Sequence, residues 1–193
     1  MIVAKVGGSL YDWPGLPHAL DAWLTSTQVD QILLVPGGGA MADVVRDYHR
    51  TFQLGEEASH WLAIGTLSVN ARLLAALLTN VTLMKHERAG DTWTGCRVLD
   101  PLPFFESDEA HPEHFPHTWQ VTSDSLALRA AIALGAGELV LLKSTDASFL
   151  NWEQASQNEV VDRYFATAMQ SAPPALSVRI VNLRRWSTEH LPE

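Results

Sequence analysis

The sequence predicts an α/β domain built on a mostly parallel sheet with helices on its faces. An apolar run, a glycine-rich turn and a helical stretch follow one another twice, at residues 2–24 and at residues 31–50. This alternation is typical of parallel sheets, because each connection must carry the chain back to the edge where strands begin. A third apolar run lies at 138–142. The 193 residues, 47% of them apolar and 18% charged, fit a single domain spanning residues 1–193.

Composition excludes several classes of partner. A net charge of -9 and a pI near 5.3 exclude nucleic acid, whose phosphate backbone requires a basic protein face. No apolar run approaches the roughly 20 residues that span a bilayer, so no membrane partner is expected. The chain starts in strand-like sequence with no basic leader, and its one cysteine, Cys96, suits a reducing compartment. We therefore expect a cytoplasmic protein.

The first element is an apolar strand that ends in Lys5-Val6-Gly7-Gly8-Ser9. Glycines let the backbone approach an anion closely, successive N–H groups can bind it, and Lys5 adds a mobile positive charge. A helix starting at Asp12-Trp13-Pro14 would have Pro14 in its first turn and would place Leu16, Leu20 and Trp23 on one face. A plain turn with a snorkelling lysine is the alternative.

The later elements follow from the same periodicities. Residues 86–119 carry four prolines and little periodicity, so we expect long connections there apart from one short strand. Gly135 is a natural stop for the helix before it. The expected elements are a strand at 31–35, a helix at 40–50, a long helix at 56–78, strands at 81–85 and 97–99, a helix from 123 to about 134, a strand at 138–142, a helix around 160–169 and a strand at 178–181.

The second glycine turn, Gly37-Gly38-Gly39, continues into Ala40-Met41-Ala42 and so matches the pattern G-x-G-x-x-A of dinucleotide-binding proteins. The context does not fit. That fingerprint requires a second strand ending in an acidic residue, whereas here Glu56 and Glu57 begin a long helix. The Walker A pattern does not occur in the chain. A phosphate-binding turn and a purely structural turn both remain possible.

Lysines are rare in this chain, and each one interrupts or closes a strand-like run. The three are Lys5, Lys85 and Lys143. The strand at 138–142 should deliver Lys143 to the carboxyl edge of the sheet, where ligands bind in open α/β folds. Asp124, at a helix start, could hold Lys5 and Lys143 together there, an arrangement suited to phosphoryl transfer. Alternatively, Asp124 only caps its helix. Lys85 is either a substrate contact or a strand end.

Three histidines, His111, His114 and His117, recur at intervals of three with Glu113 between them. Such spacing can indicate a metal site, but Pro112 and Pro116 would break a helix that aligned the rings. We therefore predict structural or solvated histidines and no metal ligands. Trp119, close to Thr122, is placed where it could line a pocket.

Three motifs, in this order along the chain, resemble those of the amino acid kinase family. They are Lys5-Val6-Gly7-Gly8-Ser9, Gly37-Gly38-Gly39, and Val121-Thr122-Ser123-Asp124-Ser125-Leu126-Ala127 leading to Leu141-Leu142-Lys143-Ser144-Thr145-Asp146. The resemblance covers most of residues 2–146 and implies a three-layer α/β/α sandwich, with ATP, accompanied by Mg²⁺, and a small phosphorylated acceptor bound end to end. It implies that Lys5 and Lys143 neutralise the transferring group and that Asp124 orients both. By position it assigns Gly7, Gly8, Ser9, Lys143, Ser144, Thr145 and Asp146 to ATP, and Gly37, Gly38, Gly39 and Thr122 to the acceptor. After Asp146 the chain departs from the family pattern.

Three features resemble one branch of that family: the short length of the chain, the sequence Trp13-Pro14-Gly15-Leu16, and the sequence of residues 119–124. This branch phosphorylates 5-(aminomethyl)-3-furanmethanol phosphate to its diphosphate in methanofuran-type cofactor synthesis. Such an acceptor carries an ammonium group, which Glu106, Asp108 or Glu109 could hold. The alternatives are a uridylate- or isopentenyl-phosphate-type kinase, a carboxylate kinase, and an inactive nucleotide or metabolite sensor. A homo-oligomer is expected.

Overall fold

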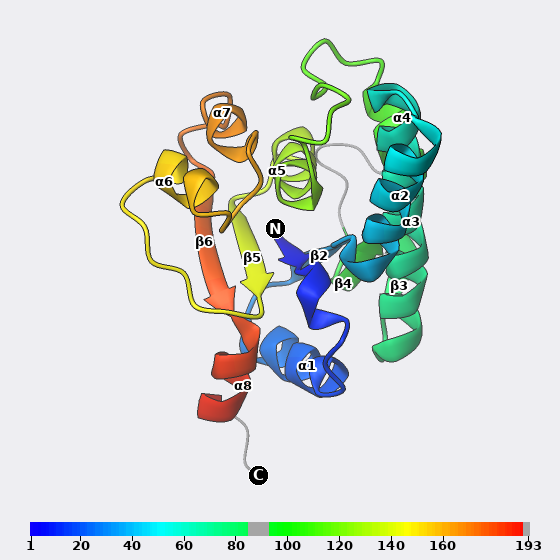
Figure 1. The fold of residues 1–193 in the computed structure, drawn as a ribbon. Helices are drawn as coiled ribbons and strands as arrows, with labels where there is room; N and C mark the ends of the chain where they lie inside the picture. The colour runs from blue at the N-terminus through cyan, green and yellow to red at the C-terminus, as the bar shows by residue number, and fades with distance from the viewer. Residues whose placement is uncertain (85–92, 191–193) are drawn as a thin grey trace.

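A computed structural model describes residues 1–84 and 93–190. In this part of the chain six parallel strands form one sheet in the order β3-β4-β2-β1-β5-β6 (Figure 1). The strand bounds are β1 Ile2–Val6, β2 Gln31–Pro36, β3 Thr82–Met84, β4 Gly95–Leu99, β5 Glu138–Lys143 and β6 Ser177–Asn182. The central strand, β1, is buried along its whole length.

Side chains alternate between the two faces of the sheet, and each face has its own core. Ile2, Ala4 and Val6 pack with α1 (Leu16–Ser26) and α8 (Leu183–His190). Val3 packs on the other face, which α4 (Pro101–Asp108), α5 (Ser123–Ala133), α6 (Trp152–Gln157) and α7 (Phe165–Met169) cover. Helices therefore form a layer on each side of the sheet (Figure 1). The predicted three-layer α/β/α fold is confirmed.

The long helix α3 (Glu56–Leu77) contributes to both cores. Ile64 and Leu67 join one cluster, whereas Ala71 and Leu74 join the other. Helix α2 (Gly39–Phe52) packs against α3 (Figure 1). No helix among residues 1–84 and 93–190 is long and apolar enough to cross a bilayer.

The register of the central strands brings three loops to one place. Lys5 is paired with Val35 on β2 and with Leu141 on β5, so these strands reach the carboxyl edge of the sheet together. The ladders extend one step further, because Gly7 N–H donates to the Leu142 carbonyl and Gly37 N–H donates to the Val6 carbonyl. Both glycine turns and Lys143 therefore meet at this edge.

Four expectations about elements were wrong. Helix α1 begins at Leu16, with Pro17 rather than Pro14 in its first turn. Residues 86–119 contain α4, which starts at Pro101; proline is tolerated there because the first helical N–H groups have no partner within the helix. Two short helices, α6 and α7, replace the single one expected near 160–169, and α8 was not expected. The strand at 81–85 is described only as Thr82–Met84, and Lys85 lies outside the described residues.

Candidate active site

Lys5, Asp124 and Lys143 meet at the carboxyl edge of the sheet. The Lys5 ammonium lies 2.9 Å from Asp124 Oδ1, while Lys143 donates to Oδ1 at 2.8 Å and to Oδ2 at 2.7 Å. Lys5 and Asp124 are buried, and the Lys143 side chain is 16% exposed. Asp124 lies in the first turn of α5, whose N-cap residue is Thr122, and the carboxylate of Asp124 contacts the two lysines.

The charges in this cluster control one another's protonation. Burial raises the pKa of Asp124, but the charges of Lys5 and Lys143 outweigh burial and lower that pKa to about 2. Burial and the charge of Lys5 lower the pKa of Lys143 to about 8, against the attraction of Asp124. At neutral pH the cluster therefore holds one carboxylate between two ammonium groups, which leaves net positive charge at the sheet edge.

A second acid, Asp162, fixes the start of α5. Its Oδ2 accepts hydrogen bonds from Thr122 N and Oγ1, both at 3.0 Å, and from Ser125 N at 2.9 Å; its Oδ1 accepts from Ser125 Oγ at 2.5 Å. Burial and the charge of Asp124 raise the pKa of Asp162. Asp162 lies between α6 and α7, and no local pattern at that position predicted its role.

The two glycine turns touch one another. A Cβ atom on Gly8 would lie 2.3 Å from Gly39 N, and one on Gly37 would lie 2.6 Å from Gly8 N. Gly39 also has a φ of +55°, a left-handed conformation that disfavours other residues. Asn70 of α3, itself buried, donates to the carbonyls of Gly37 and Gly38 at 2.7 and 2.8 Å. Asn70 was not identified from the sequence. The signal that could have identified it is its position as a polar residue among the buried apolar residues of α3.

A first cavity of about 230 Å³ opens beside these turns. Gly38, Gly39 and Thr122, which were assigned to the acceptor, line it, and so do Gly8 and Ser9, which were assigned to ATP. Gly37, also assigned to the acceptor, is not among its lining residues. Helix α2 contributes Ala42, Asp43 and Arg46; α3 contributes His60, Ala63, Ile64 and Leu67; and the segment before α5, with the first turn of that helix, contributes Thr118, Trp119, Val121, Ser123 and Leu126. Much of the wall is therefore apolar.

A second cavity of about 310 Å³ also has Ser9 in its lining. Lys143, Ser144, Thr145 and Asp146 line it, together with Ala147 and three residues that were not predicted, Asn158, Glu159 and Val160. Ser9 lines both cavities, and its hydroxyl lies 2.8 Å from that of Ser144. On α8, Arg184 donates to the Ser9 carbonyl and to Asp12, and Arg185 pairs with Asp146. The C-terminal helix thus supports the loops at this cavity.

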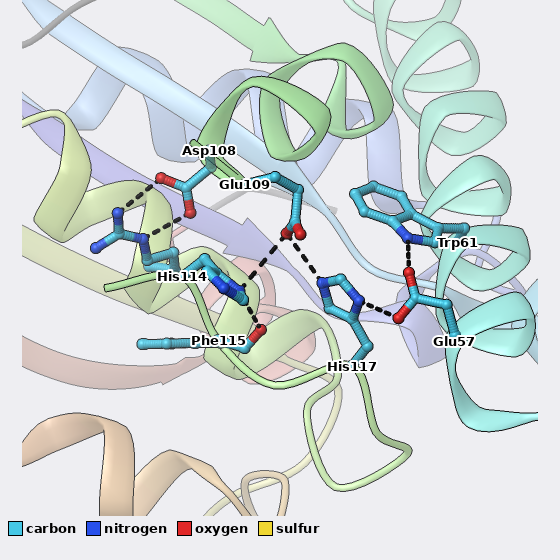
Figure 2. A network of polar contacts seen from close by, with 8 residues as sticks. Glu57, Trp61, Asp108, Glu109, His114, Phe115 and His117 are labelled. Atoms are coloured by element: carbon cyan, nitrogen blue, oxygen red, sulfur yellow. Dashed lines mark hydrogen bonds and ion pairs between the residues drawn. The ribbon is translucent and has the colours of Figure 1, made fainter. Parts of the chain in front are cut away.

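The acidic residues expected to hold an ammonium group lie elsewhere. Asp108 forms a buried bidentate pair with Arg129, both distances being 2.7 Å, and Glu106 is exposed on α4. Glu109 accepts from His117 Nε2 at 2.9 Å, and His117 Nδ1 donates to Glu57 at 2.5 Å (Figure 2). None of these three residues lines either cavity, so the geometry does not support the prediction that one of them holds an ammonium group of the acceptor.

The histidine segment forms part of that same network. Carboxylates only accept hydrogen bonds, so both nitrogens of His117 donate. Burial lowers the pKa of His117, but its bonds to Glu57 and Glu109 outweigh burial and raise it. Glu109, His114 and His117 each offer a ligand atom, and these atoms lie within 4.8 Å of one another. Within this trio, His117 is hydrogen-bonded to Glu109, whereas His114 lies 3.7 Å from Glu109 and is hydrogen-bonded to the Phe115 carbonyl (Figure 2).

The sheet order, the two helical layers and the glycine turns define a protein of the amino acid kinase fold. No family model matches the chain. The chain is 28% identical over 153 residues to the [5-(aminomethyl)furan-3-yl]methyl phosphate kinase of Methanocaldococcus jannaschii, which covers 77% of this chain and 68% of that protein. The predicted resemblance is thereby confirmed.

Two solved structures share the fold. The uridylate kinase from Archaeoglobus fulgidus superposes with a TM-score of 0.62 at 16% identity, over 96% of this chain and 92% of that one. The UMP kinase from Ureaplasma parvum also gives a TM-score of 0.62, at 14% identity, over 100% and 95% of the two chains. All three relatives are kinases, the phosphotransferase class that was predicted.

Proposed function

We propose that this protein transfers the γ-phosphoryl group of ATP to a small phosphate monoester and so forms a diphosphate. The observation that supports this most is the position of Lys5, Asp124 and Lys143 at the sheet edge where two cavities adjoin at Ser9. In this assignment the cavity that Lys143 and Ser144 line takes ATP. The cavity beside Gly38 and Gly39 takes the acceptor.

Phosphoryl transfer between two phosphates suits the groups that are present. An acceptor phosphate is already anionic at neutral pH, so its oxygen can attack the γ-phosphorus without losing a proton to the protein. The main requirement is positive charge where three phosphate groups come together. Lys5 and Lys143 supply that charge, and Asp124 keeps both ammonium groups in place between the two reactants.

The residues present also suggest how Mg²⁺ would be held. Asp124 is engaged by both lysines, and Asp162 is engaged by Thr122 and Ser125. A Mg²⁺ ion arriving with ATP would therefore take its ligands from phosphate oxygens and water, which this ion readily retains. Its charge would add to that of the lysines during transfer.

For the acceptor we propose [5-(aminomethyl)furan-3-yl]methyl phosphate or a close analogue. The relative from Methanocaldococcus jannaschii is named for that substrate. The acceptor cavity is small, about 230 Å³, and α3 gives it apolar side chains against which a ring can pack. The described residues that line it include no Asn or Gln side chain to read the edge of a uracil base. A uridylate or isopentenyl phosphate acceptor, or a carboxylate acceptor, is the alternative.

A panel of acceptors tests this function. With ATP and Mg²⁺, release of ADP and formation of a diphosphate should be fastest with the aminomethylfuran phosphate. UMP, isopentenyl phosphate and carboxylate acceptors should react more slowly. ATP binding without ADP release for any acceptor would instead indicate an inactive sensor of the same fold.

A homo-oligomer is also proposed, on the basis of α2 and α3. Large apolar side chains are exposed at helical spacing on both helices: Met41, Val44, Tyr48 and Phe52 on α2, and Leu62, Val69, Leu73 and Leu77 on α3. Exposed apolar surface of this kind is typical of interaction sites, and a second copy would cover it. Light scattering at several protein concentrations tests whether the protein forms a homo-oligomer.

The cytoplasmic location stays a prediction.

A further inference from the structure

We propose that the end of the acceptor cavity away from the glycine turns is a subsite for a primary ammonium group, with Asp43 as the residue that sets this specificity. The inference rests on the proposed function, since it concerns the cavity assigned to the acceptor. It concerns the end of the acceptor that does not react.

Asp43 is placed correctly for this role. It lies on α2 four residues after Gly39, and at 1.5 Å per residue this puts it about 6 Å along the helix from the glycine turn. Among the described residues that line the cavity, Asp43 is the only acidic one. Its Oδ1 accepts from Arg46 at 2.6 Å, and its Oδ2 has no partner among the described residues. A carboxylate oxygen is thus available to a cation in the cavity.

Arg46, the cation beside Asp43, is already occupied. Its guanidinium bonds Asp43 and lies 5.1 Å from the centre of the Trp119 ring, a cation–π contact. An anionic ligand group would gain less from Arg46, whose charge Asp43 already offsets, and it would lie close to the Asp43 carboxylate. An ammonium group meets no such repulsion, and it adds to the open oxygen of Asp43.

His60 on α3 presents a second acceptor to the same cavity. The residue is 8% exposed, and its ring nitrogens have no hydrogen-bond partner among the described residues. Burial and the charge of His117, whose ring stacks on it at 4.4 Å, lower the pKa of His60 to about 4. The neutral ring has a nitrogen that accepts a hydrogen bond from an ammonium group. The hydrogen bonds of His117 to Glu57 and Glu109 (Figure 2) thus favour the charged form of His117, and this charge favours the neutral form of His60.

A matched pair of variants can isolate Asp43. Asp47 lies one turn further along α2 and pairs with Arg50 as Asp43 pairs with Arg46, but Asp47 does not line the cavity. Asp43→Asn and Asp47→Asn therefore remove the same charge from similar exposed pairs. Circular dichroism should be unchanged in both.

The measurement is calorimetric binding in the presence of a non-hydrolysable ATP analogue. The ligands are furan-3-ylmethyl phosphates that carry an aminomethyl, a methyl or a carboxyl group at C5 of the ring. Wild-type protein should bind the amine about tenfold more tightly than the methyl compound, as expected for one charge-assisted hydrogen bond. Asp43→Asn should reduce this ratio to near one, Asp47→Asn should leave it unchanged, and His60→Leu should reduce it partly.

In the binding measurement, two results would overturn the subsite: an amine-to-methyl ratio that Asp43→Asn leaves unchanged, or a wild-type preference for the carboxyl compound, which would assign the site to Arg46. Turnover is read separately from binding. An Asp43-dependent amine preference without diphosphate formation would retain the subsite and reject the kinase. Equal kcat/KM for the amine and methyl compounds in wild-type protein would retain the kinase and reject the subsite.

Discussion

Lys143 donates to both carboxylate oxygens of Asp124, at 2.8 and 2.7 Å, and this bidentate contact fixes its ammonium group at the cavity that Ser144 and Thr145 also line. Lys5 approaches the same carboxylate from β1. One buried carboxylate thus holds two ammonium groups close together, although their like charges repel one another. In the proposed reaction, incoming phosphates meet this charge without any rearrangement of the protein.

Replacing Lys143 with Met should reduce kcat by at least about 10²-fold, since it removes one charge that stabilises the transferring phosphoryl group. The fold should persist, because Asp124 retains its pair with Lys5. A coupled ADP assay measures the loss, and thermal melting checks the fold. Lys5→Ala and Asp124→Ala should likewise abolish turnover. Full activity in any of these variants would reject its assigned role.

Activity should fall as the pH rises through about 8. Lys143 has a pKa of about 8, so it is charged below that pH and loses its charge above it. The profile of kcat/KM against pH reports the free enzyme and should show this alkaline limb. The arginine of Lys143→Arg stays charged, so this variant should show its alkaline limb at higher pH, whatever the absolute value of its kcat/KM. A wild-type profile that stays flat well above pH 8 would contradict the assignment.

Asp162→Asn should lower both activity and stability, although Asp162 does not contact either lysine. An amide offers one acceptor oxygen, so it cannot accept all four hydrogen bonds from Thr122 and Ser125. The loss of stability should be about 1–3 kcal/mol, as for other buried donors left without a partner. Denaturant melts measure it, with Asp21→Asn on α1 as a control. If the two variants had the same stability, Asp162 would not anchor α5.

Gly8→Ala should disrupt the contact between the glycine turns, because the added Cβ would lie 2.3 Å from Gly39 N. Gly65→Ala is the opposite case: nothing lies within 4 Å of its Cβ position, and alanine favours the helix by about 0.5–1 kcal/mol. Gly65→Ala should therefore raise the melting temperature while Gly8→Ala lowers it. Equal melting temperatures would show that the close approach of the turns is not required.

The sheet and its lysines could be predicted because their signals are local. Strands β1, β2 and β5 are short apolar runs that end in glycine or lysine, and parallel pairing brings such ends to one edge. Asp124 followed from a helix start at that edge. To predict that Lys5, Lys143 and Asp124 lie near one edge of the sheet, the only long-range contact that had to be assumed was the parallel pairing of the strands.

The rest of the site depends on tertiary packing. Asp162 reaches α5 from the α6–α7 connection, and Asp43 and His60 face one cavity only because α2 packs on α3. Nothing in the spacing of these residues encodes those contacts. Asp108 and Glu109 show the reverse: their charge suggested a ligand, but Arg129 and His117 take their carboxylates. Helix α4 was missed because its prolines were interpreted as breakers rather than as first-turn residues.

The most direct test of the central claim is a ³¹P NMR spectrum of the protein with ATP, Mg²⁺ and [5-(aminomethyl)furan-3-yl]methyl phosphate. The proposed transfer predicts that ADP and a new diphosphate appear together, in equal amounts, and that with Lys143→Met both appear at least about 10²-fold more slowly. Unchanged ATP, or ADP accompanied only by inorganic phosphate, would contradict transfer between the two cavities.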